Sequence, residues 1–179
     1  MFRLPKTMLA RLLLPCLAAL LTACSVTDRA PAVRLEPDAR WVVLPFANVT
    51  ETPFAGQRAE AVSEGLLRVL GVADVRRYPA SLASDNLFDN GAPKDADKSL
   101  EWARSQGARY ALTGTVDEWR YKVGVDGEPA VGVTLSIVEV SDGRVLWSAV
   151  GAKSGWSRDA LSAVAQTLIK SLLTPAVRP

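Results

Sequence analysis

The amino-acid sequence predicts an α/β fold, in which a mixed β-sheet with a C-terminal antiparallel meander packs against helices. Three observations predict this fold. Apolar residues recur at helical spacing in three segments, and strand-length apolar or alternating runs separate these segments. The last three strand segments are joined only by short turn motifs, which is typical of antiparallel hairpins. The predicted order of elements is β-α-β-α-β-β-β-α.

The first strand is predicted at residues 41–47, WVVLPFA, a continuous apolar run of strand length. Such a run suits a buried strand, and Pro45, which has no N–H to donate, indicates an edge position or a bulge. A loop at 48–56 leads into a helix predicted for 57–70, which Gly71 ends. The apolar stripe of that helix consists of Ala59, Val62, Leu66 and Val69.

A weaker strand at 72–78 and a long polar loop at 79–95 precede the second predicted helix, at 96–106. The meander then begins with a strand at 109–123. Alternation along this strand places one set of residues on a common face. That set consists of Tyr110, Leu112, Gly114 and Val116.

The meander continues through two turn motifs, DGEP at 126–129 and SDGR at 141–144, to strands at 131–137 and 145–149. On the last of these strands, Trp147 alternates with apolar neighbours, so we expect it to lie in the core or on the sheet face.

The final helix is predicted at 158–173, with Ser157 as its N-cap and Pro175 as its end. Its apolar stripe is the longest in the chain. The stripe consists of Leu161, Val164, Ala165, Leu168, Ile169 and Leu172.

The N-terminal residues have the character of a secretory signal. Three basic side chains precede or enter an apolar run at 9–21, and small residues then lead to a cysteine in the sequence LTAC at 21–24. The apolar run is too short for a spanning helix, which needs about 20 residues. A cysteine at the cleavage point is typical of bacterial lipoproteins, so we expect a signal peptide at 1–23 and lipidation of Cys24. An ordinary signal with a chance cysteine is the alternative.

The segment after the cysteine predicts where the chain is held. Ser25 stands where aspartate would retain such a lipoprotein in the inner membrane, which predicts the inner leaflet of the outer membrane. The polar sequence that follows has two prolines and no periodicity, so we expect residues 24–40 to form the lipidated cysteine and a flexible tether. A single periplasmic domain is then predicted at 41–175.

Composition excludes several kinds of site. The signal holds three of the 21 basic residues, which leaves 18 basic against 19 acidic side chains and a net charge of −1 in the mature chain. A nucleic-acid surface is therefore not indicated. The chain has no histidine, and its two cysteines are Cys16 in the signal and Cys24. Zinc sites, histidine triads and thiol nucleophiles are excluded, and we predict neither a metal nor a cofactor.

Three long segments and the lipid box carry a resemblance to a known family. The segments are LPFANVTETPFAGQRAEAVSEGLL at 44–67, GTVDEWRYKVGVDGEPAVGVTL at 114–135 and DGRVLWSAVGAKSGWSRDALSAVAQ at 142–166. They are similar to the PelC lipoproteins, and the likeness covers most of the mature chain. Wider relatives with a similar first strand and element order are the amino-terminal domain of TolB, CsgG and LpoB.

The resemblance implies a fold like the TolB amino-terminal domain and a non-enzymatic part of the Pel exopolysaccharide export apparatus. PelC-like proteins form a dodecameric ring at the periplasmic face of the outer membrane, beneath the β-barrel of PelB. Their acidic central opening guides a cationic polysaccharide to that pore. The expected partners are therefore further copies of the chain, the outer membrane, a PelB-like barrel and the polymer.

Asp126 and Glu128 flank the tip of a predicted hairpin. Taken alone, they read as a turn-former and a solvated carboxylate. In a ring, one carboxylate per subunit becomes a circle of like charges whose field is focused into the opening. The resemblance implies that Asp126, and secondarily Glu128, form an acidic pore lining. The Asp117-Glu118 pair is a weaker candidate.

Trp156 lies between Gly155 and Ser157, in the link from the last strand to the final helix. An indole on such a loop either caps the core or sits at the headgroup level of a bilayer. The resemblance favours membrane contact. Phe54, on the loop after the first strand, is a weaker candidate for a membrane or subunit contact.

Two other classes of function are open. A regulatory or assembly module like LpoB or CsgG is the alternative, but a tether of about 16 residues spans only about 20–25 Å as a coil, too little to cross the periplasm. A carbohydrate hydrolase needs two carboxylates about 5–10 Å apart in a cleft. Asp117 and Glu118 are adjacent on a strand, so we expect them to point to opposite faces. We therefore expect no enzyme.

Overall fold

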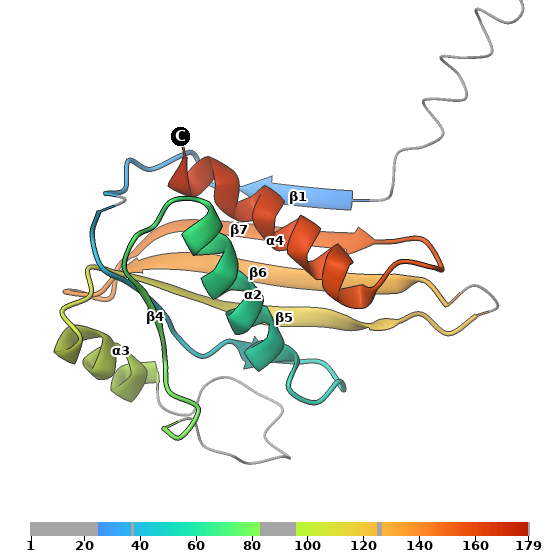
Figure 1. Ribbon diagram of the computed structural model, residues 1–179, viewed down its shortest axis with the longest axis horizontal. Coiled ribbons are helices and arrows are strands. Elements are labelled where there is room, and N and C mark those ends of the chain that lie inside the picture. The colour runs from blue at the N-terminus through green and yellow to red at the C-terminus, as the bar shows by residue number, and fades with distance from the viewer. Residues whose placement is uncertain (1–24, 37, 83–95, 125–126, 179) are drawn as a thin grey trace, which may run out of the picture.

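Helices cover the two faces of one mixed β-sheet unequally in the computed structural model (Figure 1). The structure describes residues 25–36, 38–82, 96–124 and 127–178. In chain order the elements are β1 (Ser25–Arg29), β2 (Trp41–Val43), β3 (Ala47–Asn48), α2 (Ala55–Val69), β4 (Val75–Arg77), α3 (Ala96–Ser105), β5 (Tyr110–Tyr121), β6 (Pro129–Glu139), β7 (Val145–Ser154) and α4 (Leu161–Val177).

The strand order is β1-β7-β6-β5-β2-β4, with β3 paired to β5 beyond the end of β2. The pairs β1–β7, β7–β6 and β6–β5 are antiparallel, whereas β2 and β3 run parallel to β5 and β4 runs parallel to β2. The predicted mixed sheet with a C-terminal antiparallel meander is therefore confirmed.

Two apolar clusters hold the layers together. The larger one lies between the sheet and helices α2 and α4, and it includes Trp147, which is almost fully buried as predicted. Trp41 and Tyr110 pack there with ring centroids 5.0 Å apart. The smaller cluster lies under α3, at one end of the opposite face, and includes Leu44 and Ala103. Over the rest of that face the described part of the chain places no helix (Figure 1).

The predicted first strand is interrupted at Pro45, which separates β2 from β3. The carbonyl of Pro45 accepts a hydrogen bond from the Thr113 hydroxyl at 3.2 Å. The next amide, Phe46 N–H, donates to Oε1 of Glu60 on α2 at 2.9 Å. Gly56 lets the helix approach closely, because a Cβ there would lie 2.6 Å from the Phe46 carbonyl oxygen. The sequence predicted one strand over 41–47 with an edge position or a bulge at Pro45, whereas the structure divides that strand into β2 and β3.

The prediction of a flexible tether was wrong for residues 25–29, which form strand β1. Antiparallel pairing of β1 with β7, from Ser25 opposite Lys153 to Arg29 opposite Ala149, satisfies backbone groups that would otherwise form an open edge. A polar edge strand of this kind has no apolar pattern to reveal it. Leu35 is also buried, so the chain contacts the domain well before Trp41.

The limits of the last helix also differ from the prediction. Helix α4 begins at Leu161, and Ser157 is not its cap; instead the Leu161 N–H donates to the Tyr121 hydroxyl at 3.1 Å. Pro175 lies inside the helix rather than at its end. Proline has no N–H for the carbonyl of Ser171, and a guanidinium nitrogen of Arg29 donates to that carbonyl at 3.2 Å.

Among the described residues, no helix combines the length and the apolarity that crossing a bilayer requires.

Candidate functional site

Strand β1 begins at one end of the sheet, directly after the predicted lipidation site in the sequence. Cys24 and the signal at 1–23 lie outside the described residues, but β1 begins at Ser25, the next residue in the chain. Ser25 pairs with Lys153, and Trp156 follows three residues later. Figure 1 shows the start of β1, the link from β7 to α4 and the β5–β6 hairpin at the same end of the molecule. The start of β1 and the loop of Trp156 therefore lie at the same end of the sheet.

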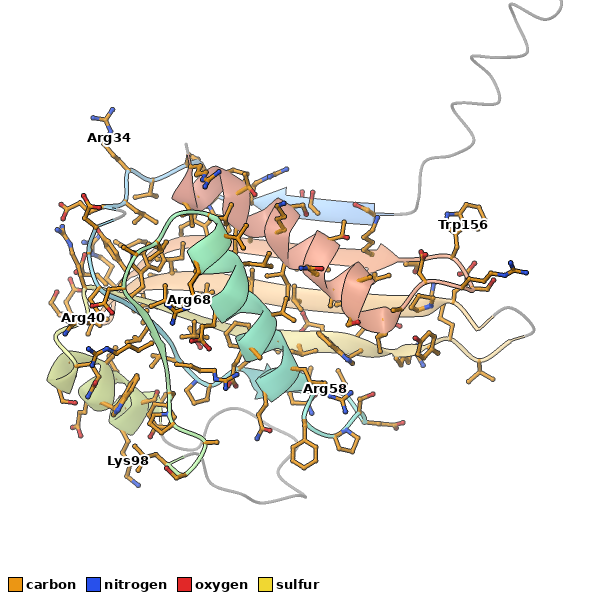
Figure 2. All side chains as sticks on the ribbon, in the orientation of Figure 1. Arg34, Arg40, Arg58, Arg68, Lys98 and Trp156 are labelled. Atoms are coloured by element: carbon orange, nitrogen blue, oxygen red, sulfur yellow. The ribbon has the colours of Figure 1, made fainter. Side chains whose placement is uncertain are left out.

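The loop that carries Trp156 is fixed by backbone contacts, whereas its indole is not buried. The Trp156 N–H donates to a carboxylate oxygen of Asp159 at 2.9 Å, and the Asp159 N–H donates to the Trp156 carbonyl at 2.8 Å. The Gly155 N–H donates to the Pro129 carbonyl at 2.8 Å, and a Cβ at Gly155 would lie only 2.6 Å from Val164. The indole projects from this loop and is 64% exposed (Figure 2), so Trp156 does not cap the core.

The β5–β6 hairpin carries the predicted acidic residues. Asp126 lies outside the described residues. Glu128 is partly exposed, and its carbonyl accepts a hydrogen bond from the Lys122 N–H at 2.7 Å. The Lys122 ammonium lies 3.9 Å from the Glu128 carboxylate and 2.7 Å from the Ser154 hydroxyl. The charge of Glu128 thus has a partial counter-charge on its own hairpin, at an exposed position where such a pair contributes little stability.

Sequence reasoning missed two residues at this end. Val123 is fully exposed, close to the hairpin tip, and Tyr121 is half-exposed while its hydroxyl caps α4. The only sequence signal for an exposed Val123 was an apolar residue close to two glycines of a predicted turn, Gly124 and Gly127, and this signal is weak. The role of Tyr121 could not be read from the sequence, because its partner Leu161 lies 40 residues away.

Phe54 lies on a different edge of the sheet and is held in an unusual backbone conformation. Its φ of 61° is left-handed, the region that glycine favours and a bulky residue rarely adopts. Side-chain bonds fix the loop: Asn48 donates to the Thr52 carbonyl at 2.9 Å, and the Thr52 hydroxyl donates to the Trp119 carbonyl at 2.5 Å. The phenyl ring is nevertheless 47% exposed.

Asp117 and Glu118 share one face of the sheet, so the prediction that they point to opposite faces was wrong. The pairing of β5 with β6 shifts between Val116 and Glu118, and Asp117 is the extra residue of this β-bulge. Both Cβ atoms lie within 3.6 Å of the position that a Cβ on Gly132 would take. Val116 and Trp119 are both buried on the helix side. The two carboxylates therefore lie on the face opposite α2 and α4, away from the end that α3 covers.

Their surroundings do not make a catalytic pair. Asp117 accepts a hydrogen bond from the Thr134 hydroxyl at 3.1 Å, and Glu118 pairs with Arg120 at 3.0 Å. Each carboxylate thus already has a partner of its own, and both lie on a solvent-facing part of the sheet rather than in the cleft that a hydrolase needs.

The buried carboxylate of Glu60 has a structural position. Burial raises the pKa of Glu60, while the hydrogen bond from the Phe46 N–H and the nearby Arg77 charge act to lower it. The Glu60 carboxylate, which accepts the Phe46 N–H between β2 and β3, holds α2 on the sheet.

Comparison with known proteins decides the family. No protein-family model and no curated protein matches the chain. Among solved structures, a PelC dodecamer from Paraburkholderia phytofirmans is 46% identical, with a TM-score of 0.73, and the match covers 85% of this chain and 96% of that one. A point variant of the same protein is 45% identical, with a TM-score of 0.76, over 87% of this chain and all of that one. The chain belongs to the PelC family.

A more distant structure shares the fold. The lipoprotein GNA1162 from Neisseria meningitidis is 19% identical, with a TM-score of 0.52, over 72% of this chain and 91% of that one. At this identity the likeness concerns the fold alone. The resemblance to PelC that the sequence segments carried is confirmed, and the elements described above are those of a PelC family member.

Proposed function

We propose that this PelC family member is a component of a Pel exopolysaccharide secretion system and assembles as a homo-oligomeric ring. The observation that carries the proposal is the likeness to two PelC structures, both dodecamers, over 96% and 100% of their length. The same fold and an identity of 45–46% support the same kind of assembly for this chain.

The ring lies against the inner leaflet of the outer membrane. Acyl chains on Cys24 supply the anchor, since two or more chains hold a protein stably where one alone is marginal. Trp156, which projects from a fixed loop beside the start of β1, is a second contact at headgroup level. Because β1 begins at the residue after Cys24, little free chain separates anchor and domain. A far-reaching regulatory module, the alternative role, is disfavoured for that reason.

The opening of the ring is acidic and guides a cationic polymer to a PelB-like barrel pore. Repetition around a ring turns one hairpin carboxylate into a circle of like charges, and low-dielectric walls focus that field. Asp126 is the first candidate for this lining. Glu128 is second, because Lys122 offsets part of its charge. Such a field concentrates the polymer without tight binding, and it requires no metal, cofactor or enzymatic step.

The charge of Asp126 is the feature to test. Asp126→Lys in the full lipoprotein should reduce polymer export severalfold, while Asp126→Asn should have a smaller effect. Export is measured as secreted polymer per amount of lipoprotein in the membrane. The matched control is Asp142→Lys, which reverses a charge in the other Asp-Gly turn of the meander, at the opposite end of β6. Normal export by the Asp126→Lys variant would sink the guiding role.

A further inference from the structure

The sheet face opposite α2 and α4 exposes apolar side chains at its β1 edge, away from α3. Val26 is 68% exposed, and Val150 on β7 is also exposed on the same face. Their orientation follows from the register: Thr27 and Gly151 pair and face α4, so Val26, Asp28 and Val150 point away from it. Asp28 has no ion-pair partner among the residues that the structure describes. We call Val26, Asp28 and Val150 the open-face patch.

The loop after β3 exposes a second apolar group. Val49 and Phe54 are both exposed, and Arg58 follows one helical turn after Phe54, whose carbonyl accepts the Arg58 N–H at 3.0 Å. The Arg58 guanidinium, labelled in Figure 2 near the start of α2, has no ion-pair partner within the described ranges. We call Val49, Phe54 and Arg58 the loop patch.

The conformation of Phe54 suggests that the loop patch serves a contact. A left-handed φ at a bulky residue is a strained arrangement, and glycine would occupy it more easily. An exposed ring gains little by burial within its own chain. An exposed aromatic ring is the kind of side chain that a partner surface can bury as an anchor.

The two patches lie at opposite edges of the sheet. In the half of the sheet that contains them, the strand order is β1-β7-β6-β5-β3. Four strand spacings separate β1 from β3, or about 19 Å. A ring needs two different surfaces on opposite sides of each subunit, because a heterologous contact closes only when one surface meets the other on the next copy. Among the residues that the structure describes, Asp28 of one patch and Arg58 of the other have no ion-pair partner, so the two patches carry opposite free charges.

We propose that the loop patch of one copy docks on the open-face patch of the next. Phe54 packs against Val26 and Val150, and Arg58 pairs with Asp28 across the interface. Glu51, on the same loop, is acidic like Asp28 and cannot pair with it. The opposite charge in the proposed contact therefore comes from Arg58. The inference rests on the proposed ring and names the surfaces that close it. The membrane, a competing occupant of the loop patch, is an outcome of the test.

Cross-linking in membranes tests the contact in the intact lipoprotein. The mature chain's own thiol, Cys24, is acylated in that form, so introduced cysteines are specific probes. A chain carrying both Asp28→Cys and Arg58→Cys should give a ladder of cross-linked multimers with a short bismaleimide. The two positions lie too far apart in one subunit to react with each other. Each single variant should give monomers, and so should the control pair Asp28→Cys with Lys170→Cys, since Lys170 lies on the exposed side of α4.

Charge exchange tests the same pair by sedimentation of the mature chain with Cys24→Ser. Arg58→Glu and Asp28→Arg should each weaken self-association about tenfold or more, because like charges then face each other. The double variant should recover most of that loss, and Lys170→Glu should cause none. Phe54→Gly should weaken assembly while leaving the melting temperature unchanged or higher, since glycine accepts the left-handed φ.

The outcomes separate this interface from the ring itself. Wild-type oligomers that resist both charge variants, with no ladder, overturn this interface and leave the ring intact. A wild-type chain that stays monomeric in solution and on lipid overturns the ring as well. Loss of vesicle binding by Phe54→Gly, with assembly unchanged, assigns the loop patch to the membrane and overturns the docking.

Discussion

At the scale of single residues, Glu60 shows how one side chain compensates for another. Pro45 breaks the first strand, and the Phe46 N–H that would have joined a sheet ladder meets the Glu60 carboxylate instead. The Glu60 carboxylate is buried because it accepts this hydrogen bond between α2 and the sheet. Its pKa is raised above the ordinary value of 4.5, chiefly because burial disfavours the charged form.

The raised pKa of Glu60 determines in which direction the stability of the fold changes with pH. Between 4.5 and the raised native value, the folded chain binds the Glu60 proton more tightly than the unfolded chain, so stability falls as pH rises through that interval. Glu60→Gln keeps an acceptor for the Phe46 N–H and removes the charge. We expect its melting temperature to exceed the wild-type value by about 2–4 °C at neutral pH, with the difference shrinking toward pH 4.5.

Thermal unfolding followed by circular dichroism from pH 4 to 8 checks this prediction. Glu101→Gln, which changes an exposed carboxylate on α3, is the control and should leave the pH profile unchanged. A Glu60→Gln variant that is less stable than wild type at every pH would contradict the prediction, since the charge itself would then be what the site requires.

At the scale of elements, β1 stabilises α4 at the proline inside that helix. Pro175 frees the Ser171 carbonyl inside α4, and Arg29 at the end of β1 donates to it. Arg178, just beyond the helix, donates to the Leu70 carbonyl at 2.6 Å and so joins α4 to the end of α2. The helix continues past a proline because other segments satisfy the backbone group that the proline leaves unpaired.

A double-mutant cycle tests this relationship. Arg29→Ala should lower the melting temperature by a few degrees in the wild-type background, because the Ser171 carbonyl loses its donor. In a Pro175→Ala background the helix supplies its own N–H, so Arg29→Ala should then have a smaller effect. Equal effects in both backgrounds would mean that Arg29 acts only through the pairing of β1 with β7.

At the scale of the whole molecule, one end of the sheet carries the features that we propose to face the membrane. The start of β1, the fixed Trp156 loop and the β5–β6 hairpin with Val123 lie together at that end (Figure 1). In the proposed ring, the contact from the loop patch of one copy to the open-face patch of the next runs roughly across the strands. Val26 of the open-face patch is the second residue of β1, so the proposed ring contact adjoins the proposed membrane surface at this end of the sheet.

Vesicle binding by the chain with Cys24→Ser isolates the contribution of Trp156. Adding Trp156→Ala should reduce partitioning onto vesicles about fivefold, because an indole at headgroup level is lost. Val145→Ala, an exposed apolar residue at the other end of β7, is the matched control. Cosedimentation measures the binding. Unchanged partitioning by the Trp156→Ala variant would remove Trp156 from the membrane surface.

The sequence by itself determined the order of elements from Trp41 onward, the apolar stripe of α4 and the burial of Trp147, because these depend on periodicity. Its stripe for α2 was wrong at Val69, which is exposed, and its single strand over 41–47 is interrupted at Pro45. It also indicated the PelC family through three long segments. Only the tertiary structure decided that residues 25–29 form a strand, that Tyr121 caps α4 and that Pro175 lies inside it. Each depends on a backbone group whose partner is distant in sequence, and Asp117 and Glu118 share a face because of a bulge set by pairing with β6. Local patterns report which side chains avoid water, whereas unpaired backbone groups find their partners only once the chain is folded.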